Sequence, residues 1–417
     1  MFEKIFNRIF VICVIVPTLA LWDPIIFIPG DGGTKLEAKL TNAKVDSFKC
    51  EKNHDWFLLW VSVEELVPFV SLECFLERMT LEYNSTDNRR GHNRKGVEIR
   101  VAGNSYGNVS SIEYLSEWPL VKTEIFNGLI EPLKNMGYVD GFNLRGAPYD
   151  FRHAPDEKQI QLLRNLIIET YEINKKKKVI LVAHSMGGII LNILLRLESK
   201  KWKEKYIKKV ITISTPWGGT MKTLKLITTG DNLGIFVVNG KELRDFQRSM
   251  QSTMLLLPSK IWGNDPVILS QGKNYTAFDY ASLFKDINFQ EGYERYKTVE
   301  TLLNDVQDMD VELICTHGID VDTLQYLDYR NTNISTGTPT SIYEKADGTV
   351  NLKSLKYCQN WKNTKYVTFQ KSEHNGILHD KQFIKFFMET IFKEDPTYTY
   401  KELIKPSIVY KTSNFQT

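Results

Sequence analysis

The chain has 417 residues, of which 42% are hydrophobic, and its formal net charge at pH 7 is +3. This length and composition suit a folded globular protein with room for insertions, and they exclude a disordered or fibrous chain. The small net charge gives no reason to expect a nucleic-acid partner.

The first twenty residues are typical of a secretory signal peptide. Lys4 and Arg8 precede an apolar stretch at 9–16, and small residues follow at 17–20. The stretch is shorter than the roughly 20 apolar residues that a membrane span needs. We therefore expect a cleaved signal at residues 1–20 and a mature protein in the secretory pathway, either in the lysosome lumen or outside the cell.

Of the five cysteines, Cys13 would be removed with the signal peptide. In a secreted protein, we expect the other four to form two disulfides, in one of three possible pairings. Neighbour pairing is the simplest choice among Cys50, Cys74, Cys315 and Cys358. No cysteine or histidine cluster is typical of a metal site, and we expect neither a metal nor a cofactor. Four N-glycosylation sequons fit the same route, and they begin at Asn84, Asn108, Asn274 and Asn333.

Two short apolar runs predict buried strands that lead to reactive loops. Residues 24–30 run into Asp31-Gly32-Gly33, a turn that can direct a backbone N–H toward a developing oxyanion. Residues 179–183 run into Ser185, two glycines and an apolar helix over 189–197. This strand–turn–helix order is typical of a nucleophile elbow, although Ala183 stands where glycine is usual.

Residues 50–83 are unusually apolar, especially at 56–61 and 66–70. Helical spacing would bury these side chains against the core. Exposed Trp and Leu on a disulfide-closed loop would instead form a surface for lipid. Composition alone favours the core.

The rest of the chain predicts alternating strands and helices with one long interruption. An ordered loop with internal Arg–Asp pairing is expected at 143–152, and residues 220–300 suit a mobile lid or cap. The other predicted elements are a helix at 157–174, strands at 210–214, 311–316 and 366–370, and a closing helix at 381–393.

The base and the acid that activate a serine follow it along the chain in hydrolases of this architecture. His374 comes shortly after the last predicted strand, where this fold presents its base, and Asp347 lies in a tight turn before it. We therefore predict Ser185 as nucleophile, His374 as base and Asp347 as its carboxylate partner. The rejected rivals are His317, His379, Asp320 and Asp322.

Nearly the whole chain after the signal resembles the lecithin:cholesterol acyltransferase family, especially its lysosomal phospholipase A2 branch. The family's elbow also begins with alanine. The segments that carry the resemblance are Pro29-Gly30-Asp31, residues 36–40, 145–150 and 183–187, Pro216-Trp217-Gly218-Gly219, Gly230-Asp231-Asn232, residues 347–350 and Glu373-His374.

The resemblance implies an α/β-hydrolase fold with a membrane-binding insertion and a lid. It implies the same catalytic triad, both neighbour-paired disulfides, and oxyanion-hole amides at Asp31 and Met186. It also reverses the interpretation of residues 50–83, which become a membrane-binding region. The candidates for lipid insertion are Trp56, Leu58, Leu59, Trp60, Leu66 and Phe69. The chain departs from the family at Gly32, where leucine is usual.

The predicted organisation places two insertions in one hydrolase core. The core is expected at 21–49, 84–229 and 301–395, with the Asp and His loops in the last part. The other predicted segments are the signal peptide at 1–20, the membrane-binding subdomain at 50–83, the lid at 230–300 and a tail at 396–417.

The resemblance implies a calcium-independent phospholipase A and transacylase. It would move an acyl chain from a glycerophospholipid to water or to a lipid alcohol such as ceramide, at a membrane or lipoprotein surface. We expect a monomer with no nucleic-acid partner. Asp31 separates this branch from the plasma sterol acyltransferases, which have cysteine there. An ionised carboxylate would repel the developing oxyanion, whereas a protonated one would not, so we expect an acidic pH optimum. The alternatives are a secreted phosphatidylcholine-sterol acyltransferase and a non-catalytic lipid-binding protein.

Overall fold

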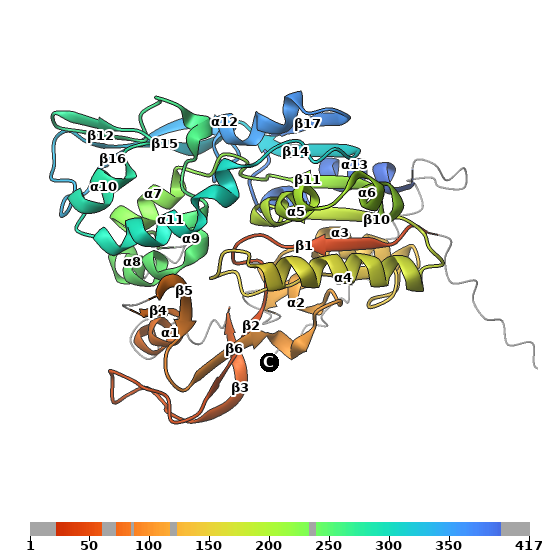
Figure 1. The fold of residues 1–417 in the computed structure, drawn as a ribbon, viewed down its shortest axis with the longest axis horizontal. Coiled ribbons are helices and arrows are strands. Elements are labelled where there is room, and N and C mark those ends of the chain that lie inside the picture. The colour runs from red at the N-terminus through yellow and green to blue at the C-terminus, as the bar shows by residue number, and fades with distance from the viewer. Residues whose placement is uncertain (1–21, 61–71, 85–86, 117–122, 233–238, 393–417) are drawn as a thin grey trace, which may run out of the picture.

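The computed structural model describes residues 22–60, 72–84, 87–116, 123–232 and 239–392 (Figure 1). The predicted signal peptide at 1–20 and the predicted tail at 396–417 lie outside these residues.

Six parallel strands form the central sheet, in the order β17-β14-β11-β10-β1-β9. Every residue of β1 and β10 is buried, which explains why these strands are continuous apolar runs rather than alternating ones. The predicted α/β-hydrolase architecture is confirmed. The strands are β1 (Ile25–Ile28), β9 (Leu144–Gly146), β10 (Val179–His184), β11 (Ile207–Ile213), β14 (Leu313–Ile319) and β17 (Thr364–Gln370).

Helices cover both faces of this sheet, and alternate strand residues enter two separate cores. Ile26 and Leu181 pack on the face of α4 (Glu157–Ile173), α5 (Met186–Leu197) and α6 (Lys200–Tyr206). Phe27 and Val182 pack on the face of α3 (Asn127–Asn135) and α13 (Lys381–Phe392). The sheet therefore holds the carboxyl ends of its strands rigidly, and those ends carry the candidate site.

A separate antiparallel sheet, here named the outer sheet, is built from β2 (Leu36–Leu40), β3 (His54–Trp60) and β6 (Val97–Val101). Figure 1 shows it below the central sheet. The expected helical spacing at 56–61 is wrong as far as residue 60, because these residues form β3 and pair with β2. Beside the outer sheet lie α1 (Leu72–Met79) and the hairpin of β4 (Leu81–Asn84) and β5 (Asp87–Asn93).

Residues 222–304, together with two later strands, form a cap at one end of the central sheet (Figure 1). The expected lapse of regular structure over 220–300 is only partly right, because most described residues there are helical. Cap strands β12 and β13 join β15 and β16 in a four-stranded sheet. The cap elements are α7 (Lys222–Thr228), α8 (Gly240–Ser249), α9 (Gln251–Leu255), α10 (Tyr280–Asp286), α11 (Gln290–Asn304), β12 (Ile268–Ser270), β13 (Lys273–Tyr275), β15 (Val321–Tyr329) and β16 (Thr340–Ala346).

Two disulfides join neighbouring segments, as predicted. Cys50 is bonded to Cys74, which ties α1 to the loop before β3. Cys315 is bonded to Cys358, which ties β14 to a short 3-10 helix at Lys356–Asn360. Other short elements are α2 (Ser110–Glu113), β7 (Tyr114–Ser116), β8 (Thr123–Glu124), α12 (Leu352–Leu355) and the 3-10 helices at Ala102–Asn104, Lys260–Trp262 and Gly376–His379.

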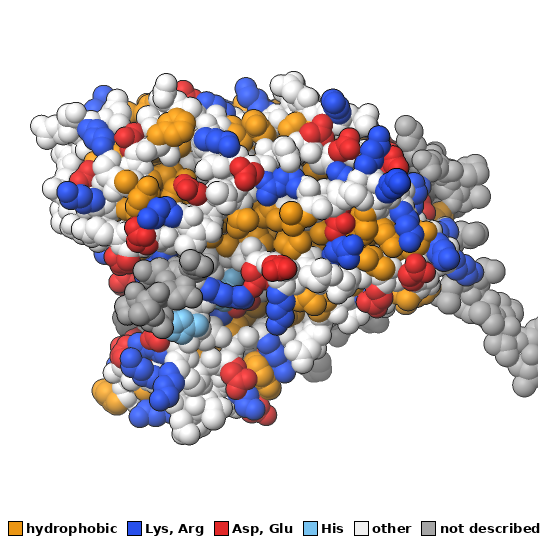
Figure 2. All heavy atoms as spheres, viewed as in Figure 1, with side chains coloured by type: hydrophobic (Ala, Val, Ile, Leu, Met, Phe, Trp, Pro, Cys, Tyr) orange, Lys and Arg blue, Asp and Glu red, His pale blue; other side chains and the backbone are white. Residues whose placement is uncertain are grey.

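The surface of the molecule mixes both signs of charge with apolar side chains. Figure 2 shows a band of hydrophobic side chains across the middle of one face, where Figure 1 places α4 and α5. Exposed residues of these two helices include Leu162 and Leu197. Among the helices of the described residues, none combines the length and the apolar character that crossing a bilayer requires.

Candidate active site

Ser185 lies at a sharp turn between β10 and α5. Its backbone has φ 52° and ψ −127°, a conformation that is uncommon for residues other than glycine. The following glycines allow α5 to approach closely. A Cβ on Gly187 would lie 2.4 Å from the Ile28 carbonyl, and one on Gly188 would lie 2.1 Å from the Thr215 hydroxyl. The two glycines of the predicted elbow are therefore required by close packing, because any side chain at these positions would clash with its neighbours.

The three residues predicted to react together form a continuous hydrogen-bonded chain. The Ser185 Oγ lies 3.0 Å from His374 Nε2, and His374 Nδ1 lies 2.8 Å from Asp347 Oδ2. Ser185, His374 and Asp347 are all buried. In this arrangement the serine donates to Nε2, while the carboxylate accepts from Nδ1–H and fixes the tautomer of the imidazole.

Asp347 remains ionised in spite of its burial. Burial alone would raise the pKa of this carboxyl group. Attraction to His374, the bond from its ring and two backbone N–H donors lower the pKa below its ordinary value instead. The donors are Thr349 at 3.0 Å and Val350 at 2.7 Å. An acceptor-only carboxylate is the form that can hold an imidazolium during proton transfer.

The rejected rivals are engaged elsewhere. The His317 ring nitrogen lies 2.6 Å from the Tyr366 hydroxyl, and His379 faces Glu124 at 3.6 Å. Asp322 pairs with Lys345 at 2.7 Å. Asp320 has a positive φ of 68° in the turn between β14 and β15. The Ser185 Oγ bonds to His374 Nε2 instead, so the geometry favours the predicted three residues.

The glycine-rich turn after β1 lies against the nucleophile. A Cβ on Gly30 would be 2.6 Å from the Ser185 Cβ and 3.2 Å from its Oγ, so only glycine permits this approach. Asp31 follows Gly30 directly, and Met186 begins α5 immediately after the serine. The structure therefore brings the two residues predicted to supply oxyanion-hole amides to the elbow. Backbone N–H groups are the usual donors to an oxyanion that forms at a nucleophilic serine.

Asp31 has an unusual protonation equilibrium for an aspartate. Desolvation by the surrounding protein raises its pKa to about 7, although the Ser252 hydroxyl, the charge of Lys222 and the Gly32 backbone each oppose the rise. Asp31 is an exposed residue by accessible surface, and this exposure weakens the desolvation that raises the pKa. Asp31 is therefore largely uncharged in acid and becomes charged near neutral pH.

His184 is a buried residue of the site that sequence reasoning did not assign a role. Its Nε2 lies 2.9 Å from the His374 carbonyl oxygen, so this nitrogen carries the proton and donates. Burial, with the nearby His374 ring, lowers the pKa of His184 to about 3. The ring consequently stays neutral in acid and holds the loop of the base. Its position directly before the nucleophile, between Ala183 and Ser185, was the feature of the sequence that could have marked His184 as a residue of the site.

The residues predicted to insert into lipid differ in burial: three are half-buried, one is fully buried, and two lie outside the described residues. Trp56 and Leu58 are half-buried, and the Arg100 guanidinium lies 3.6 Å from the centre of the Trp56 ring. Leu59 is 0% exposed and belongs to the main core, so the prediction of lipid contact is wrong for this residue. Trp60 is half-buried and packs against that core. The candidates Leu66 and Phe69 lie outside the described residues.

The predicted glycosylation sequons lie at the surface where the structure describes them. Asn108, Asn274 and Asn333 are exposed. Asn84 ends β4, and its side chain lies outside the described parts of the structure. The predicted Arg–Asp pairing in the loop before α4 is present, since Arg152 Nη2 lies 2.6 Å from Asp150 Oδ2.

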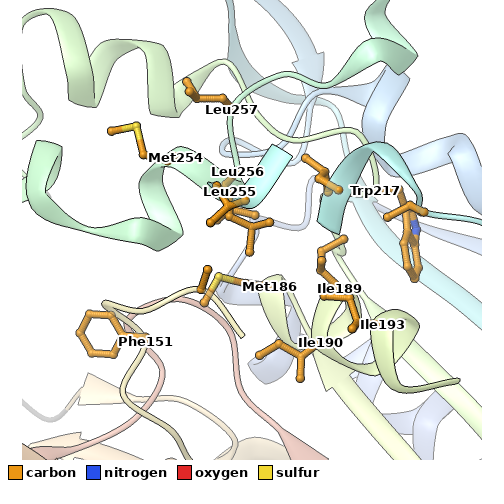
Figure 3. Close-up of a cluster of buried hydrophobic side chains, with 14 of the residues drawn as sticks. Phe151, Met186, Ile189, Ile190, Ile193, Trp217, Met254, Leu255, Leu256 and Leu257 are labelled. Atoms are coloured by element: carbon orange, nitrogen blue, oxygen red, sulfur yellow. The ribbon is translucent and has the colours of Figure 1, made fainter. Parts of the chain in front are cut away.

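An apolar wall lines the elbow on its helical side. Figure 3 shows side chains of α5 opposite those at the end of α9, in one buried cluster. The wall is defined here as Met186, Ile189, Ile190, Ile193 and Met254, Leu255, Leu256 and Leu257. Within the ranges that the structure describes, no three His, Cys, Asp or Glu side chains come together as a metal site would require.

Comparisons with known proteins agree with this geometry. The sequence model of the lecithin:cholesterol acyltransferase family matches residues 56–389. The chain is 34% identical to a rat (Rattus norvegicus) protein named lysosomal phospholipase A and acyltransferase, over 89% of this chain and 91% of the relative. It is 32% identical to the phosphatidylcholine-sterol acyltransferase of Gallus gallus, over 85% and 86% of the two chains.

One solved structure supports the fold independently. A chain of the Tle4–Tli4 complex superposes with a TM-score of 0.52 and covers 89% of this chain and 98% of its own length. The two sequences are 13% identical, so this likeness concerns the arrangement of the elements alone.

Proposed function

This chain belongs to the lecithin:cholesterol acyltransferase family, and on that premise we propose that it is a phospholipase A and acyltransferase of the lysosomal type. The observation that carries the proposal is the chain of bonds from Ser185 through His374 to Asp347, beside the Gly30 turn. The relatives named lysosomal phospholipase A and acyltransferase support the same substrate class. We place the protein in the secretory pathway, with the acidic lysosome lumen as its site of action.

The first half of the reaction forms an acyl-enzyme. The Ser185 Oγ attacks the carbonyl carbon of a fatty-acyl ester while its proton passes to His374 Nε2. Asp347 stabilises the imidazolium, and the amides of Asp31 and Met186 bind the tetrahedral oxyanion. The bond from the carbonyl carbon to the glycerol oxygen then breaks, and that oxygen takes the proton from His374. The products are a lysophospholipid and acylated Ser185.

The second half transfers the acyl chain to an acceptor. Water or the primary hydroxyl of a lipid alcohol such as ceramide gives its proton to His374 and attacks the acyl carbonyl carbon. The second tetrahedral intermediate collapses, and the proton returns to Ser185 Oγ. The apolar wall supports this proposal, because a fatty-acyl chain next to the elbow would meet aliphatic side chains rather than water.

Phosphatidylcholine liposomes that contain ceramide provide the test, with free fatty acid and acylceramide as readouts between about pH 4 and pH 8. We expect an activity peak in acid, both products, no effect of a calcium chelator, and no activity for Ser185→Ala. Liposomes with cholesterol in place of ceramide form the second arm. Transfer to the sterol alone, near neutral pH, would move the protein to the function of the sterol acyltransferases. Equal rates for wild type and Ser185→Ala would overturn the proposal.

A further inference from the structure

The side chain of Trp60 reaches from the outer sheet to the turn that carries Asp31. Its indole N–H donates to the Gly32 carbonyl, with 2.8 Å between the nitrogen and the oxygen. The ring also lies over the turn, because a Cβ on Gly32 would be 3.4 Å from Trp60 Cζ2. The last residue of β3 is therefore in direct contact with the residue that follows Asp31.

The turn needs such a contact because its own sequence does not fix it. Gly32 has a φ of +73°, and it stands between Asp31 and another glycine. Glycine loses more conformational freedom on folding than any other residue, so a turn of this kind is easily loosened. Within the turn, the Gly33 N–H donates to the Gly30 carbonyl at 3.1 Å. The Asp31 carboxyl group also accepts from the Gly32 N–H, but neither of these two bonds involves the Pro29 or the Gly32 carbonyl.

Two aromatic donors restrain these two carbonyls. The Tyr149 hydroxyl donates to the Pro29 carbonyl at 2.9 Å, and the Trp60 indole donates to the Gly32 carbonyl. Tyr149 belongs to the hydrolase core and is buried, whereas Trp60 belongs to the outer sheet. The Pro29–Gly30 and Gly32–Gly33 peptide groups, at the two ends of the turn that carries Asp31, are thus held by different parts of the molecule.

The Trp60 ring is itself held in place. Its centre lies 5.2 Å from that of Phe151, which follows the strand β9 in the core. It lies 6.3 Å from that of Phe75 on α1, the helix that the Cys50–Cys74 disulfide anchors. Phe75 in turn lies 6.2 Å from Phe246 of α8 in the cap. The indole therefore packs between Phe151 of the core and Phe75 of α1, and Phe75 connects this packing to the cap.

We propose that Trp60 is a positioning residue for the oxyanion hole, and that through it the outer sheet sets the rate of the chemical step. This proposal rests on the function proposed above. Because rotation of the peptide after Gly32 is restrained, the Asp31 amide is kept in the orientation that meets the developing oxyanion. The role that we assign to Trp60 is thus contact with the turn rather than insertion into lipid.

The variant Trp60→Phe tests the proposal, because it keeps an aromatic ring and removes the N–H. A water-soluble ester such as p-nitrophenyl butyrate separates chemistry from binding to a lipid surface, and a fluorophosphonate titrates the reactive Ser185. We expect kcat per titrated serine to fall by about 10- to 100-fold with KM nearly unchanged, because loosening a donor costs no more than removing one. Liposome binding should stay at the wild-type level.

The matched control is Trp22→Phe. The Trp22 indole also donates to a backbone carbonyl, that of Met136 at 2.9 Å. Trp22 is half-buried and precedes β1, whose opposite end leads to the site. Its kcat should equal that of the wild type. Tyr149→Phe removes the other donor to the turn without touching β3, and it should also lower kcat rather than raise KM.

A kcat for Trp60→Phe within about twofold of Trp22→Phe would overturn the role of the indole, because a factor of two is only about 0.4 kcal/mol. A rise in KM at unchanged kcat would also overturn it, since that pattern belongs to lost binding. If wild type neither hydrolyses the ester nor reacts with the fluorophosphonate, the proposed function itself fails and this inference falls with it. If Trp60→Phe does not fold, wild-type kcat in Tyr149→Phe would contradict the restrained-turn mechanism.

Discussion

At the scale of single residues, Asp31 connects the electrostatics of the site to the pH at which it works. Its pKa is raised to about 7, so the carboxyl group is neutral below that pH and charged above it. A negative charge next to the oxyanion opposes the transition state. Activity limited by Asp31 is therefore present in acid and is lost as the pH rises through about 7.

The variant Asp31→Asn should keep its activity at neutral pH, because an amide stays uncharged throughout. We expect the upper limb of the kcat/KM profile on a soluble ester to move upward by at least about one pH unit. Asp245→Asn on α8 is the control, since its side chain is 85% exposed and it lies outside the site. An upper limb that stays in place in Asp31→Asn would contradict the role given to this carboxyl group.

The reacting residues were predictable because their roles are tied to their order along the chain. Ser185 follows the buried strand β10, and His374 follows β17, the last strand of the central sheet. Because the strands are parallel, the topology alone brings both residues to the same edge of the sheet. The contacts of Trp60 and His184 were not predictable. Their partners, Gly32 and His374, are 28 and 190 residues away along the chain. No local sequence pattern predicts that an indole or an imidazole will donate to so distant a carbonyl.

At the scale of elements, β3 offers two neighbouring leucines with opposite environments. Leu59 is 0% exposed, whereas Leu58 is half-buried on the other face of the strand.

Leu59→Ala should lower the free energy of unfolding by about 2–5 kcal/mol because it leaves a cavity. Leu58→Ala should cost less than about 1 kcal/mol and weaken binding to phospholipid liposomes instead. Denaturant titration and liposome sedimentation of both variants would check this division. Equal loss of stability, or unchanged sedimentation of Leu58→Ala, would contradict it.

Elements were predictable from the sequence where burial was complete. Strands β1 and β10, and residues 210–213 at the end of β11, are rich in β-branched and other apolar residues, and such runs are typical of buried parallel strands. Strand β9 has only three residues, which is too short for a periodic signal. Strand β3 contains a mixture of aromatic and aliphatic residues on both faces, so its pattern also suited a helix.

At the scale of the whole molecule, Arg152 joins the hydrolase core to α1, to the hairpin of β4 and β5, and to the cap. Its guanidinium pairs with Asp150 and donates to the Met79 carbonyl at 3.1 Å and to Asn93 Oδ1 at 2.8 Å. Its backbone carbonyl accepts from the Gln251 N–H at 2.9 Å, at the start of α9. The side chain is 0% exposed, so each of these bonds lies in a low-dielectric interior.

The variant Arg152→Met should lower the free energy of unfolding by about 3–5 kcal/mol, because it leaves buried acceptors and the Asp150 charge without their partner. Arg330→Met is the matched control. Arg330 pairs with Asp328 at the same distance, 2.6 Å, and at the same spacing of two residues, but its side chain is 60% exposed. We expect the control to cost less than about 1 kcal/mol. Equal losses in denaturant titrations of the two variants would refute a joining role for Arg152.

The order of the bonded residues along the chain has a consequence for biosynthesis. The disulfides close within 24 and 43 residues, so each can form soon after its second cysteine enters the lumen. The bond between Ser185 and His374 spans 189 residues, and His374 is translated shortly before α13. A nascent chain that has not yet reached residue 374 therefore contains its nucleophile but not its base. Until His374 is made, such a chain cannot form the bond that activates Ser185, so we expect it to be inert toward the lipids of the membrane that it crosses.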